Sequence, residues 1–390
     1  MPDAQEQITV RTAAAIAEVP ATAWDACAGT DNPFVSHAFL AALEESGSAA
    51  PEAGWLPRHI LVEDAVGTLL GCAPAYLKTH SYGEYVFDHG WADAWERAGG
   101  SYYPKLLCGV PFTPVPGPRL LVRPDAQSER VETALAAGMV EIARQLDLSS
   151  VHINFLPERQ WRKLGEMGLL QRTGQQFHWE NRGYDSFDAF LDSLNARKRK
   201  AIRKERREVA EAGVTLRRLR GGEVEQRHWD AFWRFYRNTT DRKWGEAYLT
   251  RDFFDRIGTS MADRIVLVVA EAGNQIVAGA LNLAGSDTLY GRNWGCSAHF
   301  PFLHFEACYY QAIEHAIVHG LKRVEAGAQG QHKIQRGYLP VPTYSAHWIA
   351  DARFRGAVAD FLARERAAVA AGIEELTEFS PFRREDGSGG

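Results

Sequence analysis

The segment from Glu325 to Trp348 brings together residue types that proton transfer and anion binding require. The imidazole of His332 has an unperturbed pKa near neutrality, so it can act as a general base or orient one. The cations Lys333 and Arg336 suit an anionic donor or a substrate carboxylate. Three more side chains of the segment are expected to contact the substrate: Gln329, Gln331 and Tyr338. The alternative is an ordinary polar surface loop in which His332 bonds to backbone.

The backbone of the same segment is expected to be irregular. Gly327 and Gly330 permit conformations that other residues resist. Pro340 and Pro342 then favour an extended exit from the loop. Aromatic side chains follow, and pockets use such rings as walls. The combination favours a binding loop over a simple connection.

Two residues next to this segment in the expected fold are further catalytic candidates. His304 and Glu306 open a helix predicted over residues 305–320. A glutamate in a first helical turn commonly interacts with the helix dipole, which is the simpler explanation for Glu306. Polar and aromatic sets at the ends of predicted elements are expected to shape a substrate pocket: Asp88, His89, Trp91, Asp241, Arg242, Trp244, Asn293 and Trp294. Histidines at HExxH spacing are absent, so the sequence predicts no metal site.

A run of cations marks the middle of the chain. Eight lysines and arginines fall between Arg197 and Arg207, with Leu194, Ile202 and Val209 on an apolar side. Such a run is usually the solvated face of an amphipathic helix. The functional interpretation is an anion or donor site for a nucleotide, a phosphate-bearing donor or tRNA, formed by Arg197, Lys198, Arg203 and Lys204.

Composition limits the function classes. The 390 residues are 45% hydrophobic and 24% charged, which is typical of a globular protein with one or two cored domains. The net charge of −5 argues against general nucleic-acid binding. Five scattered cysteines without CxxC spacing suit a reducing cytoplasm and no structural zinc. We find neither a secretory signal nor an apolar run long enough to span a membrane, so a cytoplasmic location is expected.

The expected elements occur twice in the same order. In the first half, a helix after Ser36 is followed by a hairpin over 59–79, a third strand over 84–91, a helix over 127–147 and a strand over 151–156. In the second half, a helix near 228–238 precedes a hairpin over 264–284, a strand ending in Arg292–Trp294, the helix over 305–320 and a strand at 323–328. A last amphipathic helix is expected over 354–376.

This repeat predicts an α/β (α+β) fold of two tandem units, each with a mixed, mostly antiparallel sheet flanked by helices. The domains are expected at residues 1–180 and 181–390, with a basic helix over about 188–212 opening the second and the last helix closing it. One large domain with chance similarity between its halves is the alternative.

Five stretches together resemble a known family. They are VFDHGW at 86–91, YYPKLLCGVPFTPVPGPRLL at 102–121, LNARKRKAIRKERREV at 194–209, GRNWG at 291–295 and GAQGQHKIQRGYLPVPTYSAHW at 327–348. In this order they resemble the peptidoglycan biosynthesis/recognition family of predicted N-acyltransferases, which is Fem-like and lies within the GNAT superfamily. The resemblance implies two GNAT-like domains in tandem.

The resemblance also implies a reaction. A GNAT-like N-acyltransferase moves an acyl group from acyl-CoA, a co-substrate rather than a permanently bound cofactor, to a small-molecule or peptide amine. Direct attack assisted by a general base is expected. The Q/R-x-x-G-x-G/A turn that binds acetyl-CoA in GNAT enzymes is not found, and residues 296–305 lack its glycines.

Two other functions stay open. An aminoacyl-tRNA-dependent Fem-like ligase acting on a cell-wall precursor or peptide would use the basic run 197–207 for tRNA phosphates. The helical hairpin of Fem-like ligases is short or absent here. A non-catalytic module that binds an amino sugar or peptide would also explain the missing pyrophosphate signature.

Overall fold

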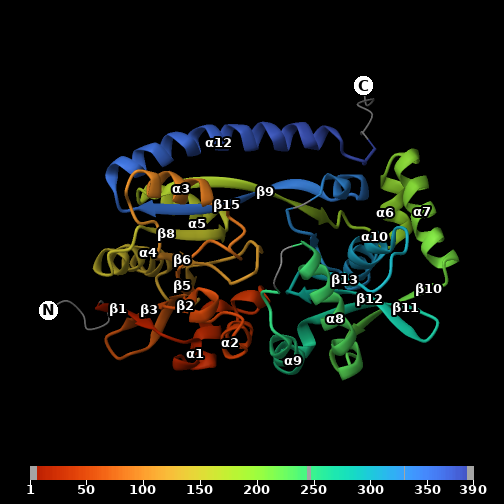
Figure 1. The fold of residues 1–390 in the computed structure, drawn as a ribbon, viewed down its shortest axis with the longest axis horizontal. Coiled ribbons are helices and arrows are strands. Elements are labelled where there is room, and N and C mark those ends of the chain that lie inside the picture. Colours follow the sequence, from red (N-terminus) through yellow and green to blue (C-terminus); the bar gives the residue numbers. More distant parts are fainter. Residues whose placement is uncertain (1–6, 244–246, 329, 384–390) are drawn as a thin grey trace. The chain divides into compact units, whose positions relative to one another are not determined.

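The structure is a computed structural model that describes residues 7–243, 247–328 and 330–383, with the side chains of 240–243 and 331 excepted. The chain divides into two compact units that are not single continuous segments. Unit 1 comprises Met1–Gly174, Tyr248–Ile257 and Thr343–Val369, and unit 2 comprises Gln175–Ala247, Gly258–Pro342 and Ala370–Gly390. The path of the chain through the elements can be followed in Figure 1.

Unit 1 contains a small antiparallel sheet in the order β1-β3-β4-β7. Its strands are β1 (Ile8–Ala13), β3 (His59–Asp64), β4 (Leu69–Ala73) and β7 (Leu121–Val122). Helix α4 (Ser128–Gln145) packs on β3 and β4 through Val131, Leu135 and Met139, all of them buried. The connections contain α1 (Ala21–Ala28) and α2 (His37–Glu45). The Ser36 hydroxyl caps α2 by accepting from the amide of Phe39, as the sequence predicted.

A second set of strands in unit 1 runs in the order β15-β8-β6-β5-β2. These are β15 (Leu339–Ile349), β8 (Ser150–Leu156), β6 (Lys105–Cys108), β5 (Ala75–Lys78) and β2 (Trp55–Pro57). Strands β6 and β8 are parallel, and α4 provides the crossover between them. Helix α3 (His89–Arg97) shares an apolar cluster with the start of α12 (Ala352–Glu378), and α5 (Glu158–Glu166) follows β8.

Unit 2 has strands in the order β10-β11-β12-β13-β14-β9. They are β10 (Val214–Arg220), β11 (Ile265–Ala272), β12 (Gln275–Ala284), β13 (Thr288–Cys296), β14 (Arg323–Glu325) and β9 (Leu170–Glu180). The helices are α6 (Phe187–Ser193), α7 (Ala196–Glu211), α8 (Gln226–Lys243), α9 (Arg251–Ser260), α10 (Leu303–Phe305) and α11 (Gln311–Val318). Helix α8 lies against β12 and β13 (Figure 1). Strands β9 and β15 and helices α9 and α12 carry residues of both units.

The two units repeat one plan, and the predicted fold class is confirmed. Each has an antiparallel hairpin, β3–β4 and β11–β12, at the positions expected from the sequence. Each has a parallel strand pair joined by a helix, β6–α4–β8 and β13–α11–β14. The sheets are otherwise mostly antiparallel and flanked by helices, which makes the fold two tandem GNAT-like domains. The predicted boundary at residue 180 stays a prediction.

The prediction of a third strand over residues 84–91 is wrong. Gly83 and Tyr85 have left-handed backbones, with φ of 80° and 59°, and these interrupt the extended run. Asp88 then precedes helix α3, whose Trp91 and Ala92 are buried. Residues 84–91 are therefore not the counterpart of the second-half strand that ends in Arg292–Trp294, because the unit 1 counterpart of β13 is β6.

The basic segment and the helix over 305–320 are each less regular than expected. Leu194 and Asn195 separate α6 from α7, and the Asn195 side chain caps α7 at the amide of Lys198, 3.0 Å away. Between α10 and α11 the residues Glu306–Tyr310 form a π-helical turn. Within the described residues, no helix is long and apolar enough to cross a membrane.

Replacing Gly295 by alanine is expected to destabilise unit 2 by about 1–3 kcal/mol, because the added methyl overpacks the contact of β13 with α8. A Cβ atom at Gly295 would lie 2.3 Å from the carbonyl oxygen of Phe235, and backbone cannot rotate away as a side chain can. Urea denaturation measures the change. The matched control is Gly356→Ala on α12, where a Cβ meets nothing within 4 Å and helix propensity favours alanine. Equal stability of the two variants would contradict the prediction.

Candidate functional site

Strands β13 and β14 of unit 2 part beside the predicted loop. Their parallel pairing covers only Thr288–Tyr290 and Arg323–Glu325, after which β14 ends while β13 continues to Cys296. Arg292 is an extra residue in β13, because Asn282 pairs with Gly291 and Leu281 with Asn293. The π-helical turn Glu306–Tyr310 begins shortly after β13. Bulges and π-turns occur frequently at functional sites, because they redirect side chains.

A tyrosine and a histidine meet at this position. The hydroxyl of Tyr309, in the π-turn, lies 3.0 Å from Nε2 of His332, in the 3-10 turn Gln331–Arg336. The His332 side chain is exposed, whereas most of Tyr309 is buried. Gly330 precedes the turn with φ of 97°, and a Cβ there would lie 2.3 Å from the imidazole. Only glycine therefore lets the backbone approach the ring so closely.

The protonation states of this pair suit proton transfer. Partial burial lowers the pKa of His332, and the neighbouring charges of Arg336 and Lys333 lower it further. Its imidazole is therefore neutral at pH 7 and able to accept a proton. Burial raises the pKa of Tyr309 well above its ordinary value, so the phenol keeps its proton. One group is a base and the other a hydroxyl donor, in direct contact.

The cations of the loop are occupied inside the protein. The buried Lys333 ammonium donates to the carbonyl oxygens of Ala326 and, at 3.2 Å, of Gly327, and burial lowers its pKa to about 8. Arg336 donates to the carbonyl oxygen of His332 at 2.8 Å and to Glu205 at 2.8 Å, and its guanidinium lies 3.5 Å over the ring of Phe305. These contacts hold the 3-10 turn in place, so both residues position His332 in this structure.

The other two catalytic candidates differ in their surroundings. Glu306 is buried, and both of its oxygens are bonded: Arg206 donates to them at 3.1 Å and Gln311 donates at 2.8 Å. A carboxylate paired in this way is a poor base. The ring of His304 is half-buried and lies 5.4 Å from the rings of Trp294 and Tyr309. Asn293 is half-buried and directly precedes Trp294 on β13.

The predicted substrate contacts are only partly described. Tyr338 is fully buried and donates to the carbonyl oxygen of Tyr309 at 3.2 Å, so it supports the π-turn from below. Residues 244 and 329 and the side chains of 241, 242 and 331 lie outside the part of the chain that the structure describes. The predictions that fall on them concern Trp244, Gln329, Asp241, Arg242 and Gln331.

Several cations of α7 have acidic or polar partners. Lys198 donates to Gln335 of the 3-10 turn. Arg203 lies 3.2 Å from Asp188, and Lys204 lies 3.4 Å from Glu208, in exposed pairs. Arg197 is exposed. Surface pairs of this kind contribute about 0–1 kcal/mol each and open readily, so these cations stay available to an anion.

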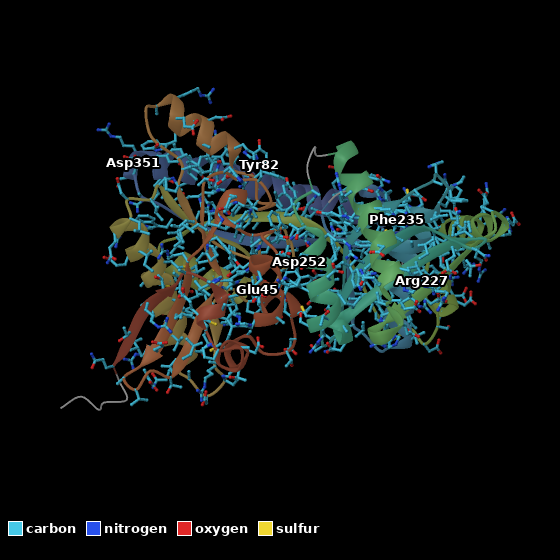
Figure 2. All side chains as sticks on the ribbon, turned by 60° about the horizontal axis from the view of Figure 1, so that its bottom comes forward. Glu45, Tyr82, Arg227, Phe235, Asp252 and Asp351 are labelled. Carbon is cyan, nitrogen blue, oxygen red and sulfur yellow. The ribbon has the colours of Figure 1, made fainter. Side chains whose placement is uncertain are left out.

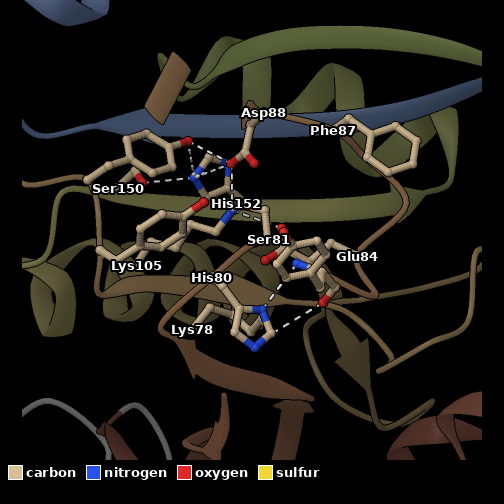
Figure 3. Close-up of polar contacts among 12 residues, drawn as sticks. Lys78, His80, Ser81, Glu84, Phe87, Asp88, Lys105, Ser150 and His152 are labelled. Carbon is tan, nitrogen blue, oxygen red and sulfur yellow. Dashed lines mark hydrogen bonds and ion pairs between the residues drawn. The ribbon is translucent and has the colours of Figure 1, made fainter. Parts of the chain in front are cut away.

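Unit 1 holds a second polar cluster around Asp88, shown in Figure 3. The completely buried ammonium of Lys105 donates to Ser81 at 2.8 Å, to Glu84 at 2.9 Å and to Asp88 at 2.5 Å. The hydroxyl of Tyr102 also donates to Asp88, at 2.7 Å. All three donors of the ammonium are thus used.

Two histidines extend this cluster. Nδ1 of His152 lies 2.7 Å from Nδ1 of His347, and the hydroxyl of Tyr102 lies 3.4 Å from Nε2 of His152. Burial lowers the pKa of His152 to about 3, so its ring is neutral. The ring of Trp91 packs 5.1 Å from that of His347, which makes Trp91 a core residue, whereas His89 is exposed.

The charges of this cluster are strongly coupled. Burial raises the pKa of Glu84 to about 7 against the opposing effect of Lys105. Burial would also raise the pKa of Asp88, but Lys105 and His152 outweigh it and hold that pKa far below its ordinary value. Burial lowers the pKa of Lys78 to about 7, although Glu84 acts the other way. A carboxyl and an amine of one cluster therefore both titrate near neutrality.

This coupling predicts a minimum of stability near pH 7. Glu84 binds a proton more tightly in the folded state, so its contribution is full below about pH 4.5 and is lost as the pH rises through about 7. Lys78 binds its proton less tightly when folded, so stability returns between about pH 7 and 10.5. The acid limb amounts to about 3 kcal/mol and the alkaline limb to about 5 kcal/mol. Urea denaturation across this pH range measures both limbs. Asp88 does not contribute to them, because its lowered pKa makes it bind a proton only in more acidic solution.

Two variants separate the limbs of that profile. Glu84→Gln is expected to remove most of the fall in the free energy of unfolding between pH 5 and 7. Lys78→Met is expected to remove most of its rise above pH 7. A Glu84→Gln profile that keeps the acid limb unchanged would show that another group causes it.

Several residues of the Tyr309–His332 pair and of the cluster around Asp88 were not singled out from the sequence. For some of them the sequence does contain a recognisable pattern. Lys105 is a lone cation in the apolar strand KLLC, which indicates a buried, paired charge. His152 and His347 alternate with apolar residues in β8 and β15. Tyr309 had no local signal, because only the π-turn directs its hydroxyl toward His332.

Comparisons with known proteins agree with this fold. The sequence profile of the FemAB-like family, described as peptidoglycan biosynthesis/recognition, matches residues 15–384. No curated protein sequence matches the chain. The crystal structure of FemX has a TM-score of 0.55 at 12% identity, with 87% of this chain and 98% of that chain covered.

Two further solved structures are similar. The C-terminal DUF2156 domain of an Agrobacterium fabrum protein assigned as a lysylphosphatidylglycerol synthetase has a TM-score of 0.54 at 11% identity, covering 88% of this chain and 94% of that one. A tandem GNAT protein from the clavulanic acid biosynthesis pathway has a TM-score of 0.47 at 12% identity, covering 88% and 98%. At these identities the likenesses concern the fold alone. Because the family profile spans nearly all of the described residues, the chain belongs to the FemAB-like peptidoglycan biosynthesis/recognition family.

Proposed function

We propose that the protein is an N-acyltransferase that moves an acyl group from acyl-CoA to an amine, with the reaction at Tyr309 and His332 of unit 2. The observation that carries the proposal is their 3.0 Å contact, which joins an exposed neutral imidazole to a protonated phenol beside the parted strands β13 and β14. Acyl transfer to an amine requires removal of one proton from the amine and stabilisation of the leaving group.

The pair can complete the proton balance of this reaction. With Nε2–H of His332 donating to Tyr309, Nδ1 has a lone pair that accepts the proton of the attacking amine. The C–N bond forms and the C–S bond breaks. The leaving sulfur takes the phenol proton, and Nε2–H returns a proton to the phenolic oxygen. The net transfer is one proton from nitrogen to sulfur, through two side chains already in contact.

The surrounding residues have positioning roles in this proposal. Arg336 and Lys333 fix the 3-10 turn from behind, and Gly330 lets the imidazole lie against the backbone. Trp294 and His304 stay proposed substrate contacts, since the ring of His304 contacts those of Trp294 and Tyr309, and Asn293 stays one as the neighbour of Trp294 on β13. The acceptor is an amine-bearing small molecule or peptide, and the family description favours one from peptidoglycan synthesis. We infer a cytoplasmic location from the donors.

A second donor class, aminoacyl-tRNA, is favoured by one specific observation. Helix α7 presents exposed cations, among them Arg197, Lys200 and Arg207, in the same unit as the Tyr309–His332 pair. Phosphates of an RNA would compete easily with the exposed carboxylates that pair with such residues. In this case the bond that breaks is an ester, and the leaving group is a ribose hydroxyl.

The two donors make opposite demands on Tyr309. A thiolate is a good leaving group and needs little protonation, whereas an alkoxide needs a general acid. The test incubates the protein with acetyl-CoA or with aminoacyl-tRNA and a panel of amines, and compares the wild type with Tyr309→Phe. Transfer from acetyl-CoA with a loss below about tenfold in the variant supports the acyl-CoA proposal. Transfer only from aminoacyl-tRNA, with a larger loss, replaces it by the second candidate. No transfer from either donor overturns both and favours a binding module.

A further inference from the structure

A hollow in unit 1 lies in front of the buried Lys105 cluster. Its volume is about 230 Å³, and its walls come from the loop after β5, from α3 and from Tyr103. Ser81 in this wall accepts from Lys105 and lies 2.8 Å from the hydroxyl of Tyr103. The hollow therefore has a rigid polar floor that is tied to the core by hydrogen bonds (Figure 3).

Aromatic rings form one side of the hollow. Tyr82, labelled in Figure 2, is 60% exposed. Its ring lies 5.2 Å from that of His80 and 5.8 Å from that of His89. Phe87, 59% exposed, stacks on His89 at 6.1 Å. Large rings left in solvent beside a hollow are ready contacts for a ligand.

Two carboxylates line the hollow. Asp93 and Glu96 are exposed, three residues apart on one face of α3. His80 is uncharged, since burial lowers its pKa. Both of its nitrogens are bonded, to the carbonyl oxygen of Ala53 and to the amide of Tyr82. The nearby Arg97 folds back onto the carbonyl oxygen of Asp93.

The charges of the Lys105 cluster, which lies behind Ser81, largely cancel one another. The Lys105 ammonium is surrounded by the carboxyl groups of Glu84 and Asp88, so it adds little positive potential in front of Ser81. The field in the hollow is then set by Asp93 and Glu96. It repels phosphate-bearing groups such as CoA and RNA, and attracts cations.

We propose that this hollow binds the alkylammonium group of a ligand, between the Tyr82 ring and the carboxylates of Asp93 and Glu96. Aromatic faces attract cations, and carboxylates accept the N–H donors of an ammonium group. The hydroxyl of Tyr103 offers one more acceptor. This proposal rests on the geometry of unit 1 alone. It is therefore independent of the donor that unit 2 uses, and it also stands if unit 2 transfers no acyl group.

The first experiment compares three probes of equal length at low salt: n-butylammonium, n-butanol and butyrate. Ligand-observed NMR and calorimetry measure the binding to the full chain. We expect saturable binding of n-butylammonium at least about tenfold tighter than of either other probe, and weaker binding as salt is added. Binding of n-butanol or butyrate as tight as that of the amine, or no saturable binding of the amine, overturns the proposal.

Variants locate the site. The double variant Asp93→Asn/Glu96→Gln is expected to weaken n-butylammonium binding by about tenfold. The matched control Glu129→Gln/Glu141→Gln changes the net charge equally on the exposed face of α4 and is expected to leave binding within about twofold. An equal loss in the two variants would show general charge attraction only and would overturn the site.

The aromatic wall has its own test, which does not depend on the carboxylates. Choline and its neutral isostere 3,3-dimethylbutan-1-ol differ in charge but hardly in shape. Tyr82→Ala is expected to weaken choline binding several-fold and to leave the much weaker binding of the alcohol unchanged. If this exposed substitution changes neither, the ring takes no part. A thermal melt of each variant confirms that it folds.

Discussion

Lys105→Met is expected to destabilise the protein by about 3–5 kcal/mol. The side chain of Lys105 is completely buried and forms ion pairs with Glu84 at 2.9 Å and with Asp88 at 2.5 Å. Methionine has similar length but no charge, so it leaves two carboxyl groups facing each other in the core. One of them, Asp88, keeps the hydroxyl of Tyr102 as a donor but loses the ammonium, its charged partner. Burying an unpaired charge costs more than the pair contributes.

Equilibrium urea denaturation at constant pH measures this loss. The matched control is Arg162→Gln, which removes an exposed pair with Glu158 and is expected to cost less than about 1 kcal/mol. The triple variant Lys105→Met/Glu84→Gln/Asp88→Asn removes all the charges together and is expected to recover a large part of the stability. A single variant that loses no more than Arg162→Gln would show that water reaches the cluster and screens it.

Regular elements could be predicted because their signals are local. Ser36 caps α2, the helix that was expected after it, and the apolar spacing of Val131, Leu135 and Met139 gives α4 within two residues of its predicted ends. Strands β11 and β12 form their hairpin within the expected range of 264–284. Caps, helical periodicity and turn residues all act within a few positions of the chain, so one sequence suffices to read them.

The predictions that failed concern features that depend on contacts between distant positions of the chain. Residues 84–91 were predicted to form a strand, but they do not, because Gly83 and Tyr85 have left-handed backbones and Trp91 is buried in the core. The eight neighbouring cations were predicted to lie together on the solvated face of one helix. Arg206 instead points inward and donates to Glu306, one hundred positions away. Spacing alone gives no information on such partners. The same limit applies to the candidate site, where His332 was expected but its contact with Tyr309 was not.

His332→Ala is expected to reduce acyl transfer by about 10²–10⁴-fold while changing the free energy of unfolding by less than about 1 kcal/mol. The imidazole is exposed and its contact with Tyr309 is at the edge of the unit, so removing it creates no cavity in the core. Turnover with the donor that supports transfer in the comparison of acetyl-CoA and aminoacyl-tRNA measures the first effect, and urea denaturation measures the second.

The pH profile of transfer ties this loss to proton transfer rather than to shape. A base must be unprotonated, and burial with the charges of Arg336 and Lys333 lowers the pKa of His332 below 6.5. Transfer is therefore expected to stay full at pH 7 and to fall only in more acidic solution, and this acid limb should vanish from the residual activity of His332→Ala. The matched control His319→Ala removes an exposed imidazole at the end of α11 and should change neither rate nor profile. If His332→Ala unfolds the protein, or if its residual activity keeps the acid limb, then His332 supports the loop and another group takes the proton.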